Sequence, residues 1–139
     1  MREAAFAIIW GLLGAGILAA ADFTGIWTGQ IERRNGDMED VAFQLVQKGA
    51  TVGGKLYGDY VSTPITQGTV SGDLITFVVV AAEQAGNQIN ETRLRFTGKM
   101  RDGAIELTRE REGARNAGNG GTVQFRVNSR QTFQLRRLL

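Results

Sequence analysis

Residues 93–112, RLRFTGKMRDGAIELTRERE, alternate between polar and apolar side chains on both sides of Asp102-Gly103. Such alternation is typical of a β-strand with one buried and one solvated face. An Asp-Gly pair between two alternating segments is a strong signal for a two-residue hairpin turn, because both central residues of the favoured turn need a positive φ. This stretch therefore predicts an antiparallel hairpin that turns at Asp102 and Gly103.

A turn at this position also predicts which residues face each other across the hairpin. The polar face pairs Lys99 with Glu106, Thr97 with Thr108, Arg95 with Glu110 and Arg93 with Glu112, and the apolar face pairs Met100 with Ile105 and Gly98 with Leu107. Opposite charges across a strand pair contribute about 0.2–1 kcal/mol each. A shift of one residue would remove both faces, so the register is well specified.

The same signals recur along the rest of the chain. Turns at Gly72-Asp73, Asn35-Gly36-Asp37 and Lys48-Gly49 join alternating segments, two more segments lie at 122–127 and 132–137, and the longest irregular stretches are 83–88 and 113–121. No segment after residue 21 repeats its apolar residues with the period of a helix. We expect about eight sequential antiparallel strands, enough to close an all-β, up-and-down meander into a barrel.

The early turns predict further cross-strand neighbours. Trp27 should lie opposite Leu45, and Ile31 opposite Val41. The turn at Lys48-Gly49 should bring Leu45 against Val52 on its other side.

Alternation also predicts which side chains point into the barrel. They are Trp27, Ile31, Val41, Phe43, Leu45, Ile75, Phe77, Val79, Leu94, Phe96, Met100, Ile105, Leu107, Val123, Phe125, Phe133 and Leu135. An eight-stranded barrel can be filled by its side chains or can hold one small ligand. Composition alone does not choose between the two.

The N-terminal segment has the pattern of a secretory signal peptide. Arg2 precedes an unbroken run of apolar or small residues over 4–21, which ends in Ala19-Ala20-Ala21. A signal helix cleaved after residue 21 would release a single domain over 22–139 into a secreted or periplasmic location. The alternative is a retained anchor, because a membrane helix needs roughly 17–25 apolar residues.

The chain contains neither cysteine nor histidine among its 139 residues. It therefore has no Cys/His zinc site and no Ser-His or Cys-His nucleophile pair. We expect no cofactor, no metal and no catalytic residue. A hydrolase that uses paired carboxylates is the remaining enzymatic alternative.

Charge is divided unevenly along the domain. Residues 22–91 carry four basic and nine acidic side chains, whereas residues 92–139 carry eleven basic and four acidic ones. Such polarity raises the question of an anionic partner. An exported address argues against nucleic acid, and we expect membrane contact only through an uncleaved signal segment.

The start of the first predicted strand, Gly25-Ile26-Trp27, resembles the Gly-x-Trp start of lipocalin-like and avidin-like calycins. Phe43-Gln44-Leu45, Phe96-Thr97-Gly98-Lys99 and the C-terminal 132–137 extend this likeness to small exported bacterial β-barrel domains. The resemblance implies a calycin-like barrel of roughly eight strands. It also implies that a late arginine, Arg136 or Arg137, packs over the Trp27 indole as a structural contact.

Two arginines are candidates for a binding site. The hairpin register turns Arg109 and Arg111 toward the inner face, beside Phe96 and Leu94. A charge there must be paired, solvated at the open end of the barrel, or used to bind something. One interpretation is an anion site for a carboxylate head group. The other is that the strand leaves the barrel, or bulges, before Arg109.

Aromatic residues complete the candidate site. Phe96 and Phe77 could line a ligand cavity, and Tyr57 and Tyr60 could stack on sugars near a predicted turn. Packing at strand ends is an equally common role for such tyrosines. Trp27 is expected to be a core residue, because large aromatic side chains dominate core energetics.

Together these patterns favour an exported, noncatalytic binding module for a small apolar or amphipathic molecule, held in the barrel or at its mouth. The alternative is a structural or protein-interaction domain with a filled core that acts through its surface. An apolar cavity of roughly 300 Å³ or more would favour the first function. The sequence does not indicate an oligomeric state.

Overall fold

The computed structural model describes residues 21–33, 36–58, 62–123 and 130–138, and all regular structure within them is β. The strands are β1 (Gly25–Glu32), β2 (Met38–Lys48), β3 (Thr51–Leu56), β4 (Thr63–Pro64), β5 (Thr66–Ser71), β6 (Leu74–Ala85), β7 (Gln88–Arg101), β8 (Ala104–Asn116) and β9 (Gln131–Arg137). Among these residues there is no helix of the length and apolarity needed to cross a membrane. The predicted signal helix lies outside the described residues, apart from Ala21.

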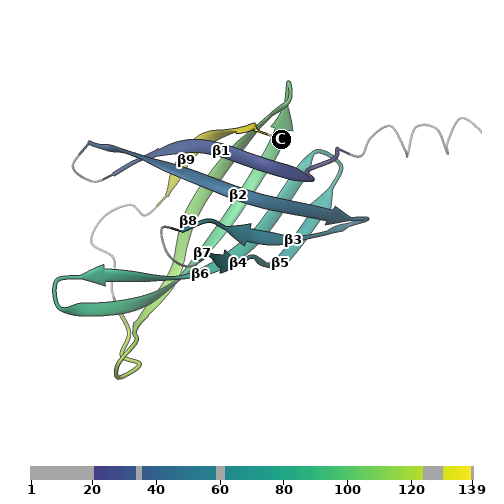
Figure 1. The fold of residues 1–139 in the computed structure, drawn as a ribbon. Helices are drawn as coiled ribbons and strands as arrows, with labels where there is room; N and C mark the ends of the chain where they lie inside the picture. The colour runs from purple at the N-terminus through teal and green to yellow at the C-terminus, as the bar shows by residue number, and fades with distance from the viewer. Residues whose placement is uncertain (1–20, 34–35, 59–61, 124–129, 139) are drawn as a thin grey trace, which may run out of the picture.

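The strands form a closed antiparallel barrel (Figure 1). β1, β2 and β3 pair in chain order, as do β5 to β9, and β9 returns to pair with β1. The ring of eight strands closes between β3 and β5, where Thr51 faces Thr69 and the Val70 N–H donates to the Ala50 carbonyl at 2.9 Å. β4 is a two-residue addition to β3. The predicted all-β, up-and-down, eight-stranded barrel is confirmed.

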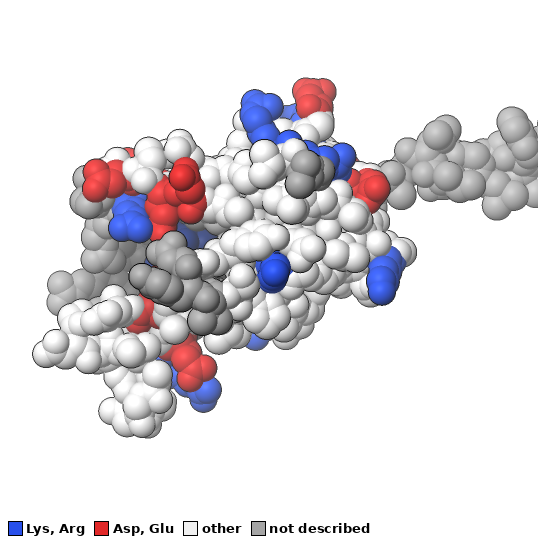
Figure 2. Space-filling view, in the orientation of Figure 1, with Lys and Arg blue, Asp and Glu red and all other residues white. Residues whose placement is uncertain are grey.

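Charged side chains are unevenly spread over the face that carries β1, β2 and β3. Figure 2 shows them mainly toward the ends of this face, with a broad region of uncharged side chains between them. Outward positions in the middle of β1 and β2 are small or uncharged, such as Thr28 and Ala42.

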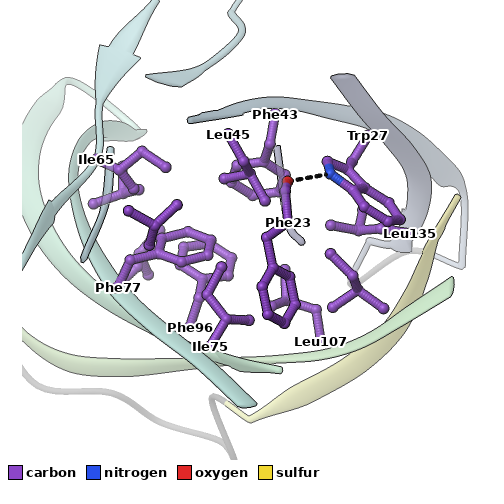
Figure 3. Packing of buried hydrophobic residues seen from close by; sticks show 14 of the residues in the cluster. Phe23, Trp27, Phe43, Leu45, Ile65, Ile75, Phe77, Phe96, Leu107 and Leu135 are labelled. Atoms are coloured by element: carbon purple, nitrogen blue, oxygen red, sulfur yellow. Dashed lines mark hydrogen bonds between the residues drawn. The ribbon is translucent and has the colours of Figure 1, made fainter. Parts of the chain in front are cut away.

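The core follows the predicted alternation closely (Figure 3). Thirteen of the predicted inward residues are buried in it, namely Trp27, Ile31, Phe43, Leu45, Ile75, Phe77, Val79, Leu94, Phe96, Ile105, Leu107, Phe133 and Leu135. Val41 and Met100 pack against it half-buried, whereas Phe125 lies outside the described residues. Four further core residues were not predicted: Phe23, Val52, Ile65 and Val70.

Val123 was predicted to point into the barrel, and it is half-buried but outside the core cluster. Its N–H donates to the Ala114 carbonyl at 3.0 Å, next to an isolated bridge between Thr122 and Arg115. The last strand occurs as predicted, over β9.

One end of the barrel is closed by the chain that precedes β1. Phe23 is fully buried, its N–H donates to the Gln47 side chain at 2.9 Å, and its carbonyl accepts the Trp27 indole N–H at 2.9 Å. The Ala21 N–H donates to the Gly72 carbonyl in the β5–β6 turn at 3.1 Å. This segment therefore lies across the end of the barrel and seals it.

The β7–β8 hairpin has the predicted turn and most of the predicted register. Asp102 and Gly103 both have positive φ, and the pairs from Met100–Ile105 to Arg95–Glu110 are as expected. The predicted cross-strand position of Glu112 opposite Arg93 is wrong, although the two side chains still form an ion pair. A bulge shifts the register after Leu94, so Arg93 lies opposite Gly113 instead.

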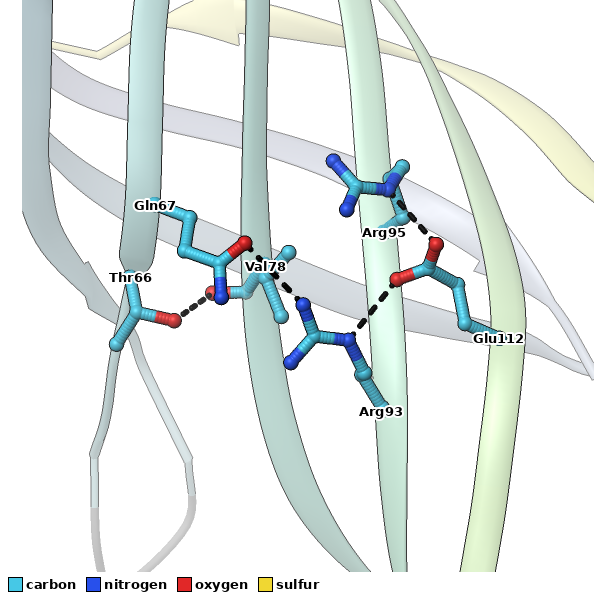
Figure 4. Close-up of polar contacts among 6 residues, drawn as sticks. All are labelled: Thr66, Gln67, Val78, Arg93, Arg95 and Glu112. Atoms are coloured by element: carbon cyan, nitrogen blue, oxygen red, sulfur yellow. Dashed lines mark hydrogen bonds and ion pairs between the residues drawn. The ribbon is translucent and has the colours of Figure 1, made fainter.

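The bulge rearranges the charge pairs on the outer face (Figure 4). Glu112 is the extra residue, and its carboxylate accepts hydrogen bonds from Arg93 Nε at 3.0 Å and Arg95 Nε at 2.9 Å. Glu110 instead lies 3.8 Å from Arg130. One carboxylate thus serves two arginines that the regular register would have given separate partners.

The β1–β2 register differs from the prediction by two residues. Trp27 faces Phe43 and Ile31 faces Glu39. The Arg33 N–H donates to the Asp37 carbonyl at 2.7 Å, whereas the predicted register would have placed Arg33 opposite Glu39. A shift of two keeps every side chain on its predicted face, which is why the core remained correct.

The β2–β3 register is also shifted by two. Leu45 faces Gly54 and not Val52, because the turn is Gly49-Ala50 and Lys48 faces Thr51. Gly49 has the positive φ that this turn needs.

Candidate functional site

The end of the barrel opposite Phe23 carries polar side chains on its inner face. Arg109 and Arg111 lie directly opposite Phe96 and Leu94, so all four side chains belong to the same face of the sheet. β8 continues beyond both arginines, and its bulge begins only at Glu112. We call this end, lined by Arg109, Arg111, Glu83 and Gln131, the mouth.

Arg109 is half-buried and only partly satisfied. Its Nη2 donates to Gln131 Oε1 at 3.2 Å. Its Nε is buried and has no hydrogen-bond partner in the part of the chain that the structure describes. Burial lowers the pKa of the guanidinium, and the charge of Arg111 lowers it further, while Glu83 and Glu39 act in the opposite direction. The group nevertheless stays charged, as arginine does in proteins.

Gln131 is fixed in position by a second contact. Its Nε2 donates to the Glu32 carbonyl at the end of β1 at 2.9 Å, while its Oε1 accepts from Arg109. The contact ties β9 to β1 at the mouth and orients the Arg109 guanidinium from one side.

Arg111 has the partner that Arg109 lacks. Its Nη2 donates to Glu83 Oε2 at 2.9 Å and its Nε to Glu83 Oε1 at 3.4 Å. Burial alone would raise the pKa of Glu83, but hydrogen bonds from Arg111 and Thr92 and the charge of both arginines outweigh it, so the pKa lies below its usual value. Glu83 stays ionised and neutralises Arg111.

This arrangement leaves one half-buried cation with an unused donor. An arginine binds a carboxylate strongly because it offers parallel N–H donors in a fixed plane. The mouth thus holds one neutralised arginine, Arg111, and one arginine, Arg109, whose Nε has no partner among the described residues. Among the described residues no group of three acidic, histidine or cysteine side chains could hold a metal ion.

Phe77 and Phe96 lie beneath the mouth and fill the middle of the barrel. Their rings stack with centroids 5.0 Å apart, and Phe43 meets them edge-on at 5.5 and 5.4 Å. All three side chains are at most 1% exposed. They form a packed aromatic cluster, and Phe96 lies opposite Arg109 in the β7–β8 register.

Tyr57 does not join the arginines. Tyr57 follows β3 on the outer surface, where it is 37% exposed and Lys55 Nζ lies 5.0 Å from its ring centroid. Tyr60 lies outside the described residues. The structure therefore separates Tyr57 from the mouth.

Of the two arginines considered for the Trp27 indole, Arg137 is the one in contact. Its guanidinium carbon lies 4.6 Å from the ring centroid, and its Nη2 donates to the Asp22 carbonyl at 2.7 Å. Arg136 is exposed on the outer face and donates to Gln134 at 3.3 Å. Trp27 itself is fully buried.

Sequence reasoning missed Glu83, Thr92 and Gln131. Glu83 was assigned to an irregular stretch, yet β6 extends as far as Ala85 and carries Val79, Ala81 and Glu83 on alternate positions. Extending that alternation by two residues would have placed Glu83 on the inner face.

Comparison with protein-family models, curated proteins and solved structures finds no match for this chain.

Proposed function

We propose that this chain is an exported, noncatalytic binding domain that receives the acidic head group of a small amphipathic molecule at the mouth of its barrel. The observation that carries the proposal is the buried Arg109 Nε, which has no partner among the described residues. A hydrogen bond to a charged group contributes about 1.5–3 kcal/mol, so an unused donor on a half-buried cation favours an anion.

Apolar surface near the mouth supports an amphipathic ligand over a simple anion. Val41, Leu56 and Ala81 are half-buried and pack against the core from β2, β3 and β6. A short hydrocarbon chain resting on them would remove apolar surface from water. Because Phe43, Phe77 and Phe96 fill the middle of the barrel, the proposal assigns the ligand to the mouth and not to the barrel centre.

The same aromatic packing favours a second candidate function. A barrel whose interior is filled by its own side chains is suited to a structural or protein-interaction domain that works through its surface. In that case Arg109 would be a half-buried side chain at the mouth, without a ligand.

Calorimetric titration with octanoate distinguishes the two candidates. We expect the full chain to bind octanoate. The Arg109→Gln variant should bind it at least about tenfold more weakly, because a charge-assisted hydrogen bond is lost. Uncharged 1-octanol should bind both proteins equally. Arg101→Gln, at the exposed end of β7 next to the β7–β8 turn, is the matched control and should bind octanoate as the unmodified chain does.

Equal octanoate affinity in the Arg109→Gln variant would overturn the assignment of the head group to Arg109. No binding of any amphipathic carboxylate would favour the surface-acting domain.

A further inference from the structure

A groove of about 510 Å³ lies on the outer surface of β1 and β2, beside the end of β3. Its lining includes the outward side chains of Thr28 and Gln30 on β1, Asp40 and Ala42 on β2, and Tyr57. We call it the Tyr57 groove. Apart from Val41, whose side chain packs against the core, the side chains of the groove point outward, whereas those of the mouth point inward.

The aromatic wall of the groove is held in place by the backbone. The Tyr57 N–H donates to the Ala42 carbonyl at 2.9 Å, which extends the β2–β3 pairing by one residue. Lys55 Nζ lies 5.0 Å from the ring centroid. The backbone of Tyr57 is therefore held beside the small side chains of Ala42 and Thr28. The Tyr57 side chain is 37% exposed, which leaves part of its surface for a ligand to contact.

The polar end of the groove is a fixed pair of side chains. Gln30 and Asp40 face each other across β1 and β2, and Gln30 Nε2 donates to Asp40 Oδ1 at 3.1 Å. This contact leaves the second Gln30 amide N–H, the Gln30 oxygen and the other Asp40 oxygen for a ligand. Donor and acceptor groups thus lie next to each other on one side of the groove.

We propose that the Tyr57 groove binds a neutral saccharide ring. The face of an aromatic ring carries negative charge density, which suits the C–H groups on the flat side of a sugar. A hydroxyl both donates and accepts, so two neighbouring sugar hydroxyls match the adjacent Gln30 and Asp40 groups. The small side chains of Ala42 and Thr28 let a flat ring lie against the strands.

Local charge does not favour a ligand of one sign. Asp40 and the Lys55 ammonium beside Tyr57 carry opposite charges at the groove, which leaves it without a net charge. Figure 2 shows few charged side chains in the middle of this face, as expected of a surface that receives an uncharged molecule. The mouth would then bind an acidic head group, and the Tyr57 groove would bind a neutral saccharide independently of it.

The test is a titration of the full chain, labelled with ¹⁵N, with cellotriose and with maltotriose, followed by amide chemical shifts. We expect saturable shifts with at least one of the two sugars, confined to the amides around residues 28–30, 40–42 and 57–58. Tyr57→Ala should weaken binding about fivefold, as loss of an aromatic contact implies. Tyr57→Phe keeps the ring and should bind as the unmodified chain does.

Two further variants guard the result. Asp40→Asn tests the polar end without altering the aromatic wall and should also weaken binding, while Ile89→Ala, an exposed apolar position on β7, should have no effect. Absence of saturable shifts with both sugars would overturn the proposal, as would shifts that Tyr57→Ala and Asp40→Asn leave unchanged. Octanoate binding at the mouth is not expected to change in any of these variants, so failure here would leave the proposed function untouched.

Discussion

Arg109 and Arg111 stand two residues apart on β8 and meet different surroundings at the mouth. Arg111 has a carboxylate partner in Glu83, whereas the Nε of Arg109 has none in the described chain. A half-buried charge without a full set of partners costs stability, and proteins retain such groups where function requires them. Binding and stability should therefore respond in opposite directions when Arg109 is replaced.

Arg109→Met is expected to raise the free energy of unfolding by about 1 kcal/mol while octanoate affinity falls. Arg111→Met should instead lower the free energy of unfolding by about 1 kcal/mol, because it leaves Glu83 without its partner at a partly exposed site. Chemical denaturation of both variants measures the two effects. A lower free energy of unfolding in Arg109→Met would mean that the guanidinium has stabilising partners in the folded protein.

Glu83 should make the fold sensitive to acid. Its folded-state pKa lies below the usual 4.5, so its contribution to stability is complete above that pH and is lost as the pH falls through the folded-state value. We expect Glu83→Gln to be less stable than the unmodified chain at neutral pH and to lose less stability on acidification. Thermal melts between neutral and strongly acidic pH measure this, with the exposed Glu106→Gln as control. Parallel pH profiles for Glu83→Gln and the unmodified chain would show that the ion pair does not stabilise the fold.

At the scale of the strands, turn chemistry was the most predictive feature of the sequence. Asp102-Gly103 predicted the β7–β8 turn, and with it the inward direction of both mouth arginines. The bulge at Glu112 was not predictable, because the Arg-Glu alternation runs through it without a break. Its origin lies in the side chains, since Glu112 reaches both Arg93 and Arg95 from the bulged position.

Contacts between non-neighbouring strands were harder to predict. The Arg111–Glu83 pair joins β8 to β6 across β7, so it depends on two registers and on the full length of β6. The predicted β1–β2 and β2–β3 registers differ from the observed ones by two residues, because the turn sequences do not fix the position at which each hairpin closes. The sequence therefore predicted the two arginines of the candidate site but not their partners Glu83 and Gln131.

Gly98 tests how closely the strands of the core are packed. A Cβ added there would lie 2.8 Å from side-chain atoms of Ile105 and Leu107, on the neighbouring strand β8. Gly98→Ala should therefore lower the free energy of unfolding by about 2 kcal/mol through overpacking. Gly113→Ala, whose added Cβ meets nothing within 4 Å, is the matched control and should stay within about 0.5 kcal/mol. Equal stability of the two variants in urea denaturation would show that the sheet yields easily at Gly98.

The whole molecule is a barrel with two unlike ends. The segment before β1 seals one end with Phe23, and charged and polar side chains line the other end. Between them the aromatic cluster of Phe43, Phe77 and Phe96 occupies the centre. Within the part of the chain that the structure describes, the second end carries the charged inner face, and the proposed amphipathic ligand meets it with its head group.

Sealing by Phe23 is expected to matter to the stability of the entire barrel. Phe23→Ala should lower the free energy of unfolding by about 3 kcal/mol, the usual cost of removing a buried aromatic ring. Val46→Ala, at an outward position on β2, should cost less than about 1 kcal/mol. Differential scanning calorimetry compares the two. A loss no larger than that of Val46→Ala would show that the N-terminal segment only rests on the barrel.

The proposed function requires the Arg109 Nε–H, which has no partner among the described residues, to donate to an anionic head group. The resonance of this N–H in a ¹⁵N-labelled sample reports on that contact, and it is assigned by its disappearance in Arg109→Lys. With octanoate we predict a downfield shift of this proton, and no change with 1-octanol. A resonance that does not respond to octanoate would contradict the proposed contact.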